Sequence, residues 1–210
     1  MIKAVAFDIG KVLLDFDYSI LVRKLSPQTQ WNEPELNDYL NQSPLLARYE
    51  SGELSSSKFF EQIKGETGFR GSETDFAALF EDIFTPIPGM IDLHRQIAQS
   101  GIPTFTFSNT NEMAVRYIAR TYDFWPIFKG HILSYEVGAL KPGAKIYEAL
   151  EECSGFTGRE IAYLDDLPEN CVAAGERGWQ VCCHKDVSYS REFFRELGVL
   201  NPSSNPDSAS

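Results

Sequence analysis

The sequence lacks long hydrophobic runs and any excess of positive charge. No uninterrupted apolar stretch approaches the roughly 18 residues of a membrane-spanning helix, and the apolar run near the N-terminus is too short for a signal-peptide core. The 19 Lys and Arg residues are outnumbered by 30 Asp and Glu residues, which gives a formal net charge of −11. Nucleic acids and anionic membranes bind basic surfaces, so we expect neither as a partner. We expect a cytoplasmic protein, in which a small anionic ligand would require locally concentrated positive charge.

Residues that build disulfides and soft-metal sites are also few. The four cysteines show no Cys-x-x-Cys spacing, and the adjacent Cys182 and Cys183 would point to opposite faces of a strand. We therefore predict reduced, buried thiols. The three histidines share no metal-ligand spacing, and we expect each to be structural or solvent-facing: His94, His131 and His184.

A length of 210 residues suits one domain, or a compact core with a modest insertion. Short continuous apolar runs, which are typical of strands buried on both faces, recur along the chain. They are Ala4 to Phe7, Thr104 to Phe107, Ile132 to Leu133, Ile161 to Leu164 and Gln180 to Cys183. Helical patterns lie between the later runs: Ile91 to Gln99, Glu112 to Tyr122, Ala144 to Glu152 and Glu169 to Arg177. This alternation predicts an α/β fold with a doubly wound parallel sheet.

The stretch between residues 18 and 85 interrupts the alternation. Apolar residues recur there at helical spacing, and the stretch contains no run that predicts a strand. Breakers at Pro86 and Pro88-Gly89 mark the return to the sheet. We therefore predict a core of residues 1–16 and 86–200 and a helical insertion of residues 17–85. Residues 201–210 offer nothing that could build a core, which predicts a disordered tail.

Two groups of polar residues follow the first strands of the predicted sheet. Asp8 follows the first strand, and ligands of open α/β sheets bind at the carboxyl ends of strands, so this carboxylate is a candidate nucleophile. Ser108-Asn109 follows the strand that ends at Phe107. Hydroxyl and amide groups before a helix N-terminus are good phosphate partners, although the same residues are common as purely structural caps.

Charged residues follow in the second half of the core. Lys141 precedes Pro142 and a predicted helix, where its ammonium would steady a negatively charged nucleophile and offset phosphate charge. Asp165-Asp166 ends the strand that begins at Ile161. Two adjacent carboxylates at a buried strand end repel each other unless positive charge lies beside them. Mg²⁺, a hard cation with oxygen ligands, fits that position better than a softer metal.

Taken in order, these four groups resemble the four motifs of the haloacid-dehalogenase superfamily. The resemblance spans nearly the whole core, and the helical insertion lies where that family carries its cap. The runs Phe7-Asp8-Ile9-Gly10-Lys11-Val12 and Ser108-Asn109-Thr110-Asn111 look especially like the branch that contains bacterial α-D-glucose-1-phosphate phosphatase. The resemblance implies a Rossmann-like α/β core with a small all-helical cap that opens and closes over the site.

It also implies a magnesium-dependent phosphatase that acts on a small phosphorylated metabolite, with a sugar phosphate as the first candidate. Asp8 would attack phosphorus, and water would hydrolyse the resulting aspartyl phosphate. Mg²⁺ would be bound by Asp8, Asp165, Asp166 and the main-chain carbonyl of Gly10.

The same resemblance assigns the phosphate contacts. Ser108 and the Asn109 amide would hold phosphate oxygens. Lys141 would offset the charge that the transition state spreads over those oxygens.

Gly10 departs from the family pattern. Most family phosphatases carry an Asp at this position, which protonates the leaving alcohol and then activates water. The first interpretation is a substrate with a better leaving group, such as a sugar 1-phosphate, with the proton supplied by water or by a cap residue; Asp15 and Asp17 lie nearby in sequence. The second is a dehalogenase that attacks carbon without metal, against which Asp165-Asp166 argues. The third is a catalytically weak member that binds a phosphorylated ligand or a protein partner.

Two other charged residues lie close to these motifs. Lys11, beside Gly10, is expected to be a solvated loop residue. Glu53 belongs to the turn Tyr49-Glu50-Ser51-Gly52-Glu53, which family members often share, but the sequence assigns it no role. No surface stripe is long enough to indicate an oligomeric state.

Overall fold

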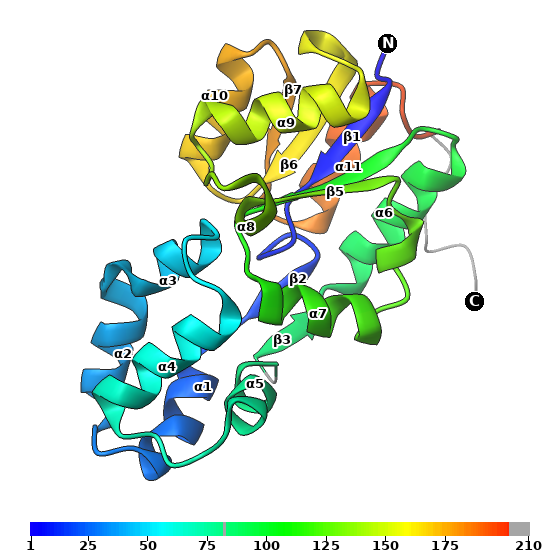
Figure 1. The fold of residues 1–210 in the computed structure, drawn as a ribbon. Helices are drawn as coiled ribbons and strands as arrows, with labels where there is room; N and C mark the ends of the chain where they lie inside the picture. The colour runs from blue at the N-terminus through cyan, green and yellow to red at the C-terminus, as the bar shows by residue number, and fades with distance from the viewer. Residues whose placement is uncertain (82, 202–210) are drawn as a thin grey trace, which may run out of the picture.

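The central sheet lies at the upper end of Figure 1, in a computed structural model that describes residues 1–81 and 83–201. Within these residues the sheet has five parallel strands in the order β5-β4-β1-β6-β7. Their bounds are β1 Ala4–Phe7, β4 Thr104–Ser108, β5 Gly130–Leu133, β6 Ile161–Asp165 and β7 Gln180–Cys183. The predicted α/β class with a parallel sheet is confirmed. The predicted tail of residues 201–210 lies outside the described residues, apart from Asn201.

Helices cover both faces of the sheet. Alternate residues of β1 face opposite ways: Val5 and Phe7 belong to one buried apolar cluster, and Ala4 and Ala6 to another. The first cluster is completed by α6 Pro88–Gln99, α7 Glu112–Thr121 and α11 Val187–Glu196. The second is completed by α9 Ala144–Ser154 and α10 Pro168–Glu176. Shorter turns lie between them: α8 Ser134–Val137, η2 Trp125–Ile127 and η3 Gly158–Glu160.

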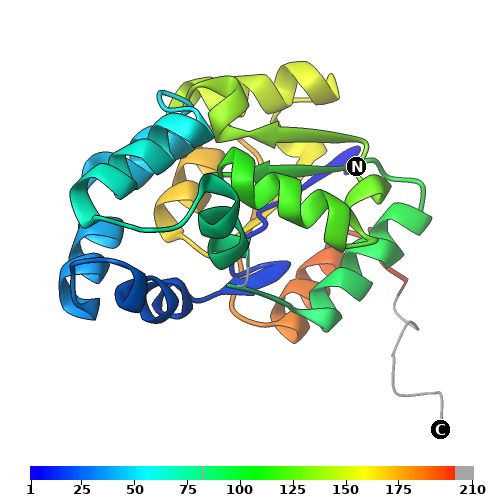
Figure 2. The same ribbon diagram turned by 60° about the horizontal axis from the view of Figure 1, so that its bottom comes forward.

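A separate helical part, the cap, lies beside the sheet in both ribbon views (Figures 1 and 2). Its elements are α1 Tyr18–Leu25, η1 Ser26–Gln28, α2 Glu33–Gln42, α3 Pro44–Glu50, α4 Ser56–Thr67 and α5 Glu73–Glu81. Local capping starts several of them: Asp17 accepts from the Ser19 N–H at the start of α1, and Asn32 and Glu35 form a capping box on α2. Aromatic rings, including Phe59, Phe76 and Phe80, fill the buried cluster of the cap.

A short antiparallel ribbon joins the two parts. Strand β2, Leu14–Phe16, pairs with β3, Phe84–Pro86, so that Phe16 lies opposite Phe84. The sequence predicts no strand between residues 18 and 85, and Phe84–Pro86 shows that this is wrong at the end of the interval. Three-residue strands are too short to show a period, and their pairing is set by a contact between residues far apart in the chain.

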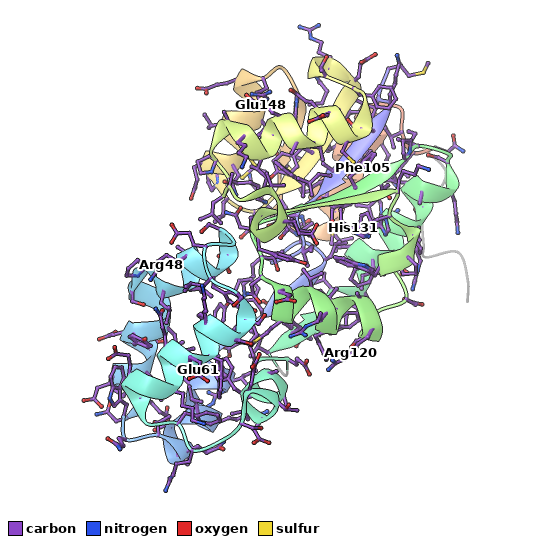
Figure 3. All side chains as sticks on the ribbon, viewed as in Figure 1. Arg48, Glu61, Phe105, Arg120, His131 and Glu148 are labelled. Carbon is purple, nitrogen blue, oxygen red and sulfur yellow. The ribbon has the colours of Figure 1, made fainter. Side chains whose placement is uncertain are left out.

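Side chains cover the outside of both parts (Figure 3). Figure 3 places Arg48 and Glu61 on the cap and Glu148 on the core. All four cysteines are free. Cys171 and Cys182 are buried, as predicted, but Cys183 is only half-buried and Cys153 is exposed near the end of α9, which corrects the prediction for these two residues. Within residues 1–81 and 83–201, no helix combines the length and hydropathy needed to cross a bilayer. The cytoplasmic location stays a prediction.

Candidate active site

The predicted site residues converge at the carboxyl edge of the sheet. Strand β1 lies between β4 and β6, so its next residue, Asp8, emerges between Ser108 and Asp165. The Asp8 N–H donates to the Leu164 carbonyl at 2.9 Å, which continues the β1–β6 pairing to the edge. Parallel strands present their carboxyl ends at one edge, and this geometry explains why residues far apart in sequence meet here.

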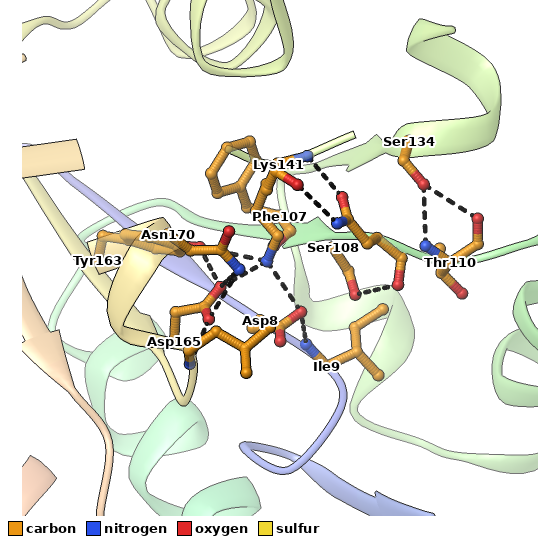
Figure 4. Close-up of polar contacts among 12 residues, drawn as sticks. Asp8, Ile9, Phe107, Ser108, Thr110, Ser134, Lys141, Tyr163, Asp165 and Asn170 are labelled. Carbon is orange, nitrogen blue, oxygen red and sulfur yellow. Dashed lines mark hydrogen bonds and ion pairs between the residues drawn. The ribbon is translucent and has the colours of Figure 1, made fainter. Parts of the chain in front are cut away.

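Lys141 is the centre of this cluster (Figure 4). Its Nζ lies 3.2 Å from Asp8 Oδ1 and 2.6 Å from Asp165 Oδ2, and it donates to the Phe107 carbonyl at 2.9 Å. The Lys141 side chain is 1% exposed. Burial alone would lower the pKa of Lys141, but Asp8 and Asp165 raise it, and the net shift is upward. The ammonium is therefore a fixed positive charge between two carboxylates.

Asp165 is fully buried and hydrogen-bonded through both oxygens. Oδ1 accepts from the Leu167 N–H at 2.8 Å and from Asn170 Nδ2 at 3.1 Å. Oδ2 accepts from Lys141 and from the hydroxyl of Tyr163. A buried charge held by this many donors is a positioning group, because it fixes the ammonium of Lys141 toward Asp8.

Asp8, Asp165 and Asp166 form the acidic cluster of the site, in which one carboxylate oxygen from each residue lies within 4.8 Å of the other two. Burial raises the pKa of Asp8 to about 7; Lys141 opposes this rise and Asp165 adds to it. Burial and Asp165 also raise the pKa of Asp166. Crowded carboxylates with raised pKa values favour a nearby cation, and an all-oxygen donor set suits a hard divalent ion.

The Gly10 carbonyl lies beside this cluster in sequence and is compatible with the predicted role. Gly10 forms a bridge with Leu14 whose hydrogen bonds use the neighbouring backbone: the Leu14 N–H donates to Ile9, and the Lys11 N–H donates to Leu14. Neither hydrogen bond engages the carbonyl of Gly10.

The Asn109 side chain holds the loop that carries Lys141. Its Oδ1 accepts from the Lys141 N–H at 2.8 Å, and its Nδ2 donates to the Lys141 carbonyl at 3.1 Å. The sequence predicts a phosphate contact for the Asn109 amide, but this side-chain amide is engaged by the Lys141 backbone. Ser108 is 2% exposed beside Asp8, and its hydroxyl lowers the pKa of that carboxyl.

The cap supplies the opposite wall of a small cavity of about 50 Å³. The wall formed by the cap and the β2–β3 ribbon, here called the cap wall, comprises Phe16, Tyr18, Glu50 and Phe84. Gly10, Ser108 and Asn109 line the other side. The cavity is smaller than the roughly 300 Å³ at which ligand pockets usually begin, so the cap wall lies close against the core.

Glu50 is the charged residue of this wall, and the sequence does not single it out. Burial, followed by the charge of Asp8, raises the pKa of Glu50 to about 7. Its carbonyl accepts from the buried Ser134 hydroxyl at 2.6 Å, and that hydroxyl also contacts both backbone groups of Thr110. Glu53, which the sequence analysis names without a role, is exposed and forms an ion pair with Arg48. Glu50 carries no local pattern, because only the docking of α3 against α8 brings it to the site.

The remaining candidates lie elsewhere. Asp15 is exposed and pairs with Lys11, and Asp17 caps α1. Lys11 has a φ of +57° and also donates to the Phe16 carbonyl, so it is engaged rather than fully solvated. The three histidines make structural contacts outside the cavity, as predicted: His94 with Thr104, His131 with Thr106 and His184 with Ser190.

Comparisons with known proteins identify the family that the four motifs resemble. The family model for haloacid dehalogenase-like hydrolase matches residues 2–177. The chain is 26% identical over 175 residues to the sesquiterpene phosphatase astK of Aspergillus oryzae, covering 82% of this chain and 84% of that protein. It is 25% identical over 177 residues to the pyrimidine 5'-nucleotidase YjjG of Escherichia coli, covering 82% and 75%.

A solved structure has the same fold. The HAD family enzyme BT-2542 of Bacteroides thetaiotaomicron, in complex with magnesium and inorganic phosphate, superposes with a TM-score of 0.79 at 21% identity. The match covers 88% of this chain and 95% of that one. At this identity the likeness shows the shared fold alone.

Proposed function

The chain belongs to the haloacid dehalogenase-like hydrolases, and we propose that it is a magnesium-dependent phosphatase that hydrolyses small phosphomonoesters through a covalent intermediate on Asp8. The observation that carries the proposal is the buried Asp8 with the Lys141 ammonium 3.2 Å from its Oδ1 and two further carboxylates within 4.8 Å. The two curated relatives named above, a phosphatase and a nucleotidase, support the same reaction class.

Hydrolysis would proceed in two steps. A carboxylate oxygen of Asp8 forms a bond to phosphorus while the bond from phosphorus to the ester oxygen breaks. Water then attacks the phosphorus of the aspartyl phosphate, which releases phosphate and regenerates Asp8. Lys141 offsets the negative charge that develops on the phosphoryl oxygens, and Asp165 keeps that ammonium in place.

Oxygen ligands for Mg²⁺ would come from Asp8, Asp166, the Gly10 carbonyl and Asp165, the last through exchange of one of its present donors. The bound cation would supply positive charge that lets an anionic nucleophile approach an anionic phosphate. Ser108 would donate to a phosphate oxygen, and a contact from Asn109 would come from its main-chain N–H because its side chain holds Lys141.

For the substrate we propose a small phosphorylated metabolite, with a sugar phosphate as the first candidate. An anomeric leaving group needs less acid assistance than an ordinary alcohol, which agrees with Gly10. The rings of Phe16, Tyr18 and Phe84 line the cavity and would pack against the carbon face of a sugar. The acidic cluster argues against metal-free attack on carbon.

The test is turnover by the purified protein with Mg²⁺ on sugar phosphates, nucleoside monophosphates and a prenyl phosphate, with 2-chloropropionate as the dehalogenase substrate. We expect phosphate release from at least one ester, and Asp8→Asn should lower kcat/KM by about 10⁴-fold or more, because the nucleophile is lost. The proposal fails if no ester is hydrolysed faster by the wild type than by Asp8→Asn. Chloride release from 2-chloropropionate without metal would favour the dehalogenase reaction instead.

A further inference from the structure

The side chain of Phe16 occupies the place where an acid at position 10 would begin. A Cβ atom built on Gly10 would lie 2.8 Å from Cε1 of Phe16, which is closer than real Cβ contacts allow. Gly10 does not have a positive φ, so the backbone would accept a side chain and the ring alone excludes it.

Phe16 is itself held in position. Lys11 Nζ donates to the Phe16 carbonyl at 2.9 Å and lies 4.8 Å above the centre of its ring. The ring also makes an edge contact with Tyr18, with centroids 5.5 Å apart. The loop after Asp8 is therefore built around an apolar ring, and it has no room for an acid at position 10.

Asp15 and Asp17 cannot supply the proton for the leaving group. Both are exposed, and neither lines the cavity. Asp15 is bound to Lys11 and accepts from the Phe16 N–H, whereas Asp17 accepts from the Ser19 N–H.

Glu50 does line the cavity, together with Gly10, Phe16 and Ser108. Among the residues that the structure describes, its carboxylate has no hydrogen-bond or ion-pair partner, although its surroundings are largely buried. A partly buried carboxyl group without a partner is costly unless it serves a function or meets a ligand.

The backbone around Glu50 is fixed to the core at two points. Ser134 Oγ donates to the Glu50 carbonyl at 2.6 Å. Two residues later, Gly52 has a φ of +77°, and a Cβ there would lie 2.2 Å from the Tyr135 carbonyl, so only glycine permits this close approach. These contacts place the side chain of Glu50 over the site whenever the cap is docked.

We propose that Glu50 is the catalytic acid and base of this enzyme, supplied from the cap in place of the acid absent at Gly10. The inference rests on the proposed phosphatase function. In the first step the Glu50 carboxyl gives its proton to the ester oxygen as the phosphorus–oxygen bond breaks and the bond to Asp8 forms. In the second step the Glu50 carboxylate takes a proton from water as the water oxygen bonds to phosphorus and the bond to Asp8 breaks. Each turnover returns Glu50 to its protonated form.

The protonation state of Glu50 agrees with both roles. Burial raises its pKa to about 7, and the charge of Asp8 contributes in the same direction. A group that titrates near neutral pH can donate and accept a proton within one cycle. Tyr18 and Tyr49 are the neighbouring titratable groups of the cap; burial holds the pKa of each phenol above its usual value, so neither competes as an acid.

The experiment compares Glu50→Gln with the wild type on two esters. One is p-nitrophenyl phosphate, whose leaving group departs without a proton, and the other is a simple alkyl phosphate. For the alkyl ester we expect kcat to fall by about 10²–10⁴-fold, because acid assistance is lost. With p-nitrophenyl phosphate the first step survives and the second slows, so we expect a burst of one equivalent of p-nitrophenol per enzyme, followed by slow turnover.

Three controls separate chemistry from folding. Glu53→Gln makes the same substitution three residues away on the exposed side of the turn and should leave both esters unaffected. Glu50→Asp keeps a carboxyl group and should retain part of the activity on the alkyl ester. Binding of inorganic phosphate with Mg²⁺, measured by calorimetry, should be unchanged in Glu50→Gln.

The outcomes are distinct. Equal losses on both esters without a burst, or no loss at all, would overturn the role of Glu50 while leaving the phosphatase function in place. A wild-type protein that hydrolyses neither these esters nor the wider panel would overturn both. A burst that appears with Glu50→Gln and not with Glu53→Gln would establish the inference.

Discussion

The core side and the cap side of the site accommodate a buried carboxylate in opposite ways. On the core side, Asp8, Lys141 and Asp165 form a network beside the cavity, here called the core wall, in which each charged group lies within 3.2 Å of another charged group. On the cap wall, the Glu50 carboxylate lies among aromatic rings without a described partner. Burial is the main reason why the pKa of Asp8 and that of Glu50 both rise to about 7.

This difference indicates how stability and chemistry are divided. The core wall is an interlocked network, so removing one member leaves other buried charges uncompensated. On the cap wall, Glu50 is held through its backbone, by the hydrogen bond from Ser134 and by the close approach of Gly52 to Tyr135. Its carboxyl group can therefore be replaced without loss of a hydrogen bond. Substitutions on the core wall should therefore affect folding and activity together, whereas substitutions on the cap wall should affect activity alone.

The largest effect should come from Lys141→Met. The substitution leaves Asp165 buried without its cation, and we expect the free energy of unfolding to fall by about 3–5 kcal/mol, with loss of activity. Urea denaturation followed by circular dichroism measures this change. Lys145→Met, an exposed lysine four residues away, is the matched control and should stay within about 0.5 kcal/mol of wild type. A Lys141→Met protein as stable as the control would show that the core wall is not interlocked.

The pH dependence of stability tests whether His94, in the scaffold behind the core wall, destabilises the folded protein in acid independently of the two walls. His94 packs edge-on against Phe7, and burial lowers its pKa to about 4 from 6.5. As the pH falls from 6.5 to 4, His94 binds a proton in the unfolded chain but not in the folded protein. This proton should reduce the free energy of unfolding by about 3 kcal/mol, with no further change below pH 4.

The double variant His94→Phe/Thr104→Val isolates this contribution, because it removes the imidazole and its hydroxyl partner together. Denaturation of both proteins between pH 7 and 4 gives the difference in their pH dependence. Identical pH dependence in the two proteins would mean that protonation of His94 does not destabilise the fold. Acid would then act through the charged groups of the two walls.

Moving the acid from the cap to position 10 of the core tests the contrast between the two walls. In the Glu50→Gln background, Gly10→Asp alone should not restore activity, because Phe16 excludes the new side chain. Adding Phe16→Ala makes room, and we expect activity on the alkyl phosphate to recover by about tenfold to a hundredfold through a general acid on the core. Steady-state kinetics on the three variants measures this. Recovery without Phe16→Ala would contradict the steric argument.

The smallest effect should come from Ser134→Ala. Ser134 is fully buried and links Glu50 to Thr110, so its loss leaves the Thr110 N–H without its acceptor. We expect the free energy of unfolding to fall by about 1–3 kcal/mol and turnover of the alkyl ester to fall more than the stability alone explains. Ser57→Ala, an exposed serine of the cap, serves as the comparison and should change neither quantity.

Sequence reasoning anticipates that the residues of the core wall converge and misses those of the cap wall, for a physical reason. Asp8, Ser108 and Asp165 each follow an apolar run, so their convergence is implied once the strands are recognised as parallel. Glu50 and Phe16 depend on how α3 and the β2–β3 ribbon dock, which no local pattern encodes. The engagement of the Asn109 side chain by the Lys141 backbone is equally non-local.

A base carried on the cap also sets the lifetime of the phosphorylated enzyme. Water can be activated only while Ser134 and Gly52 keep α3 docked, so an undocking event before hydrolysis would leave the phosphoryl group on Asp8. The rate of cap motion would then determine how long the phosphorylated intermediate persists. A hydroxyl compound that enters during that interval would compete with water for the phosphoryl group, so the rate of undocking would determine how strictly this enzyme is a hydrolase.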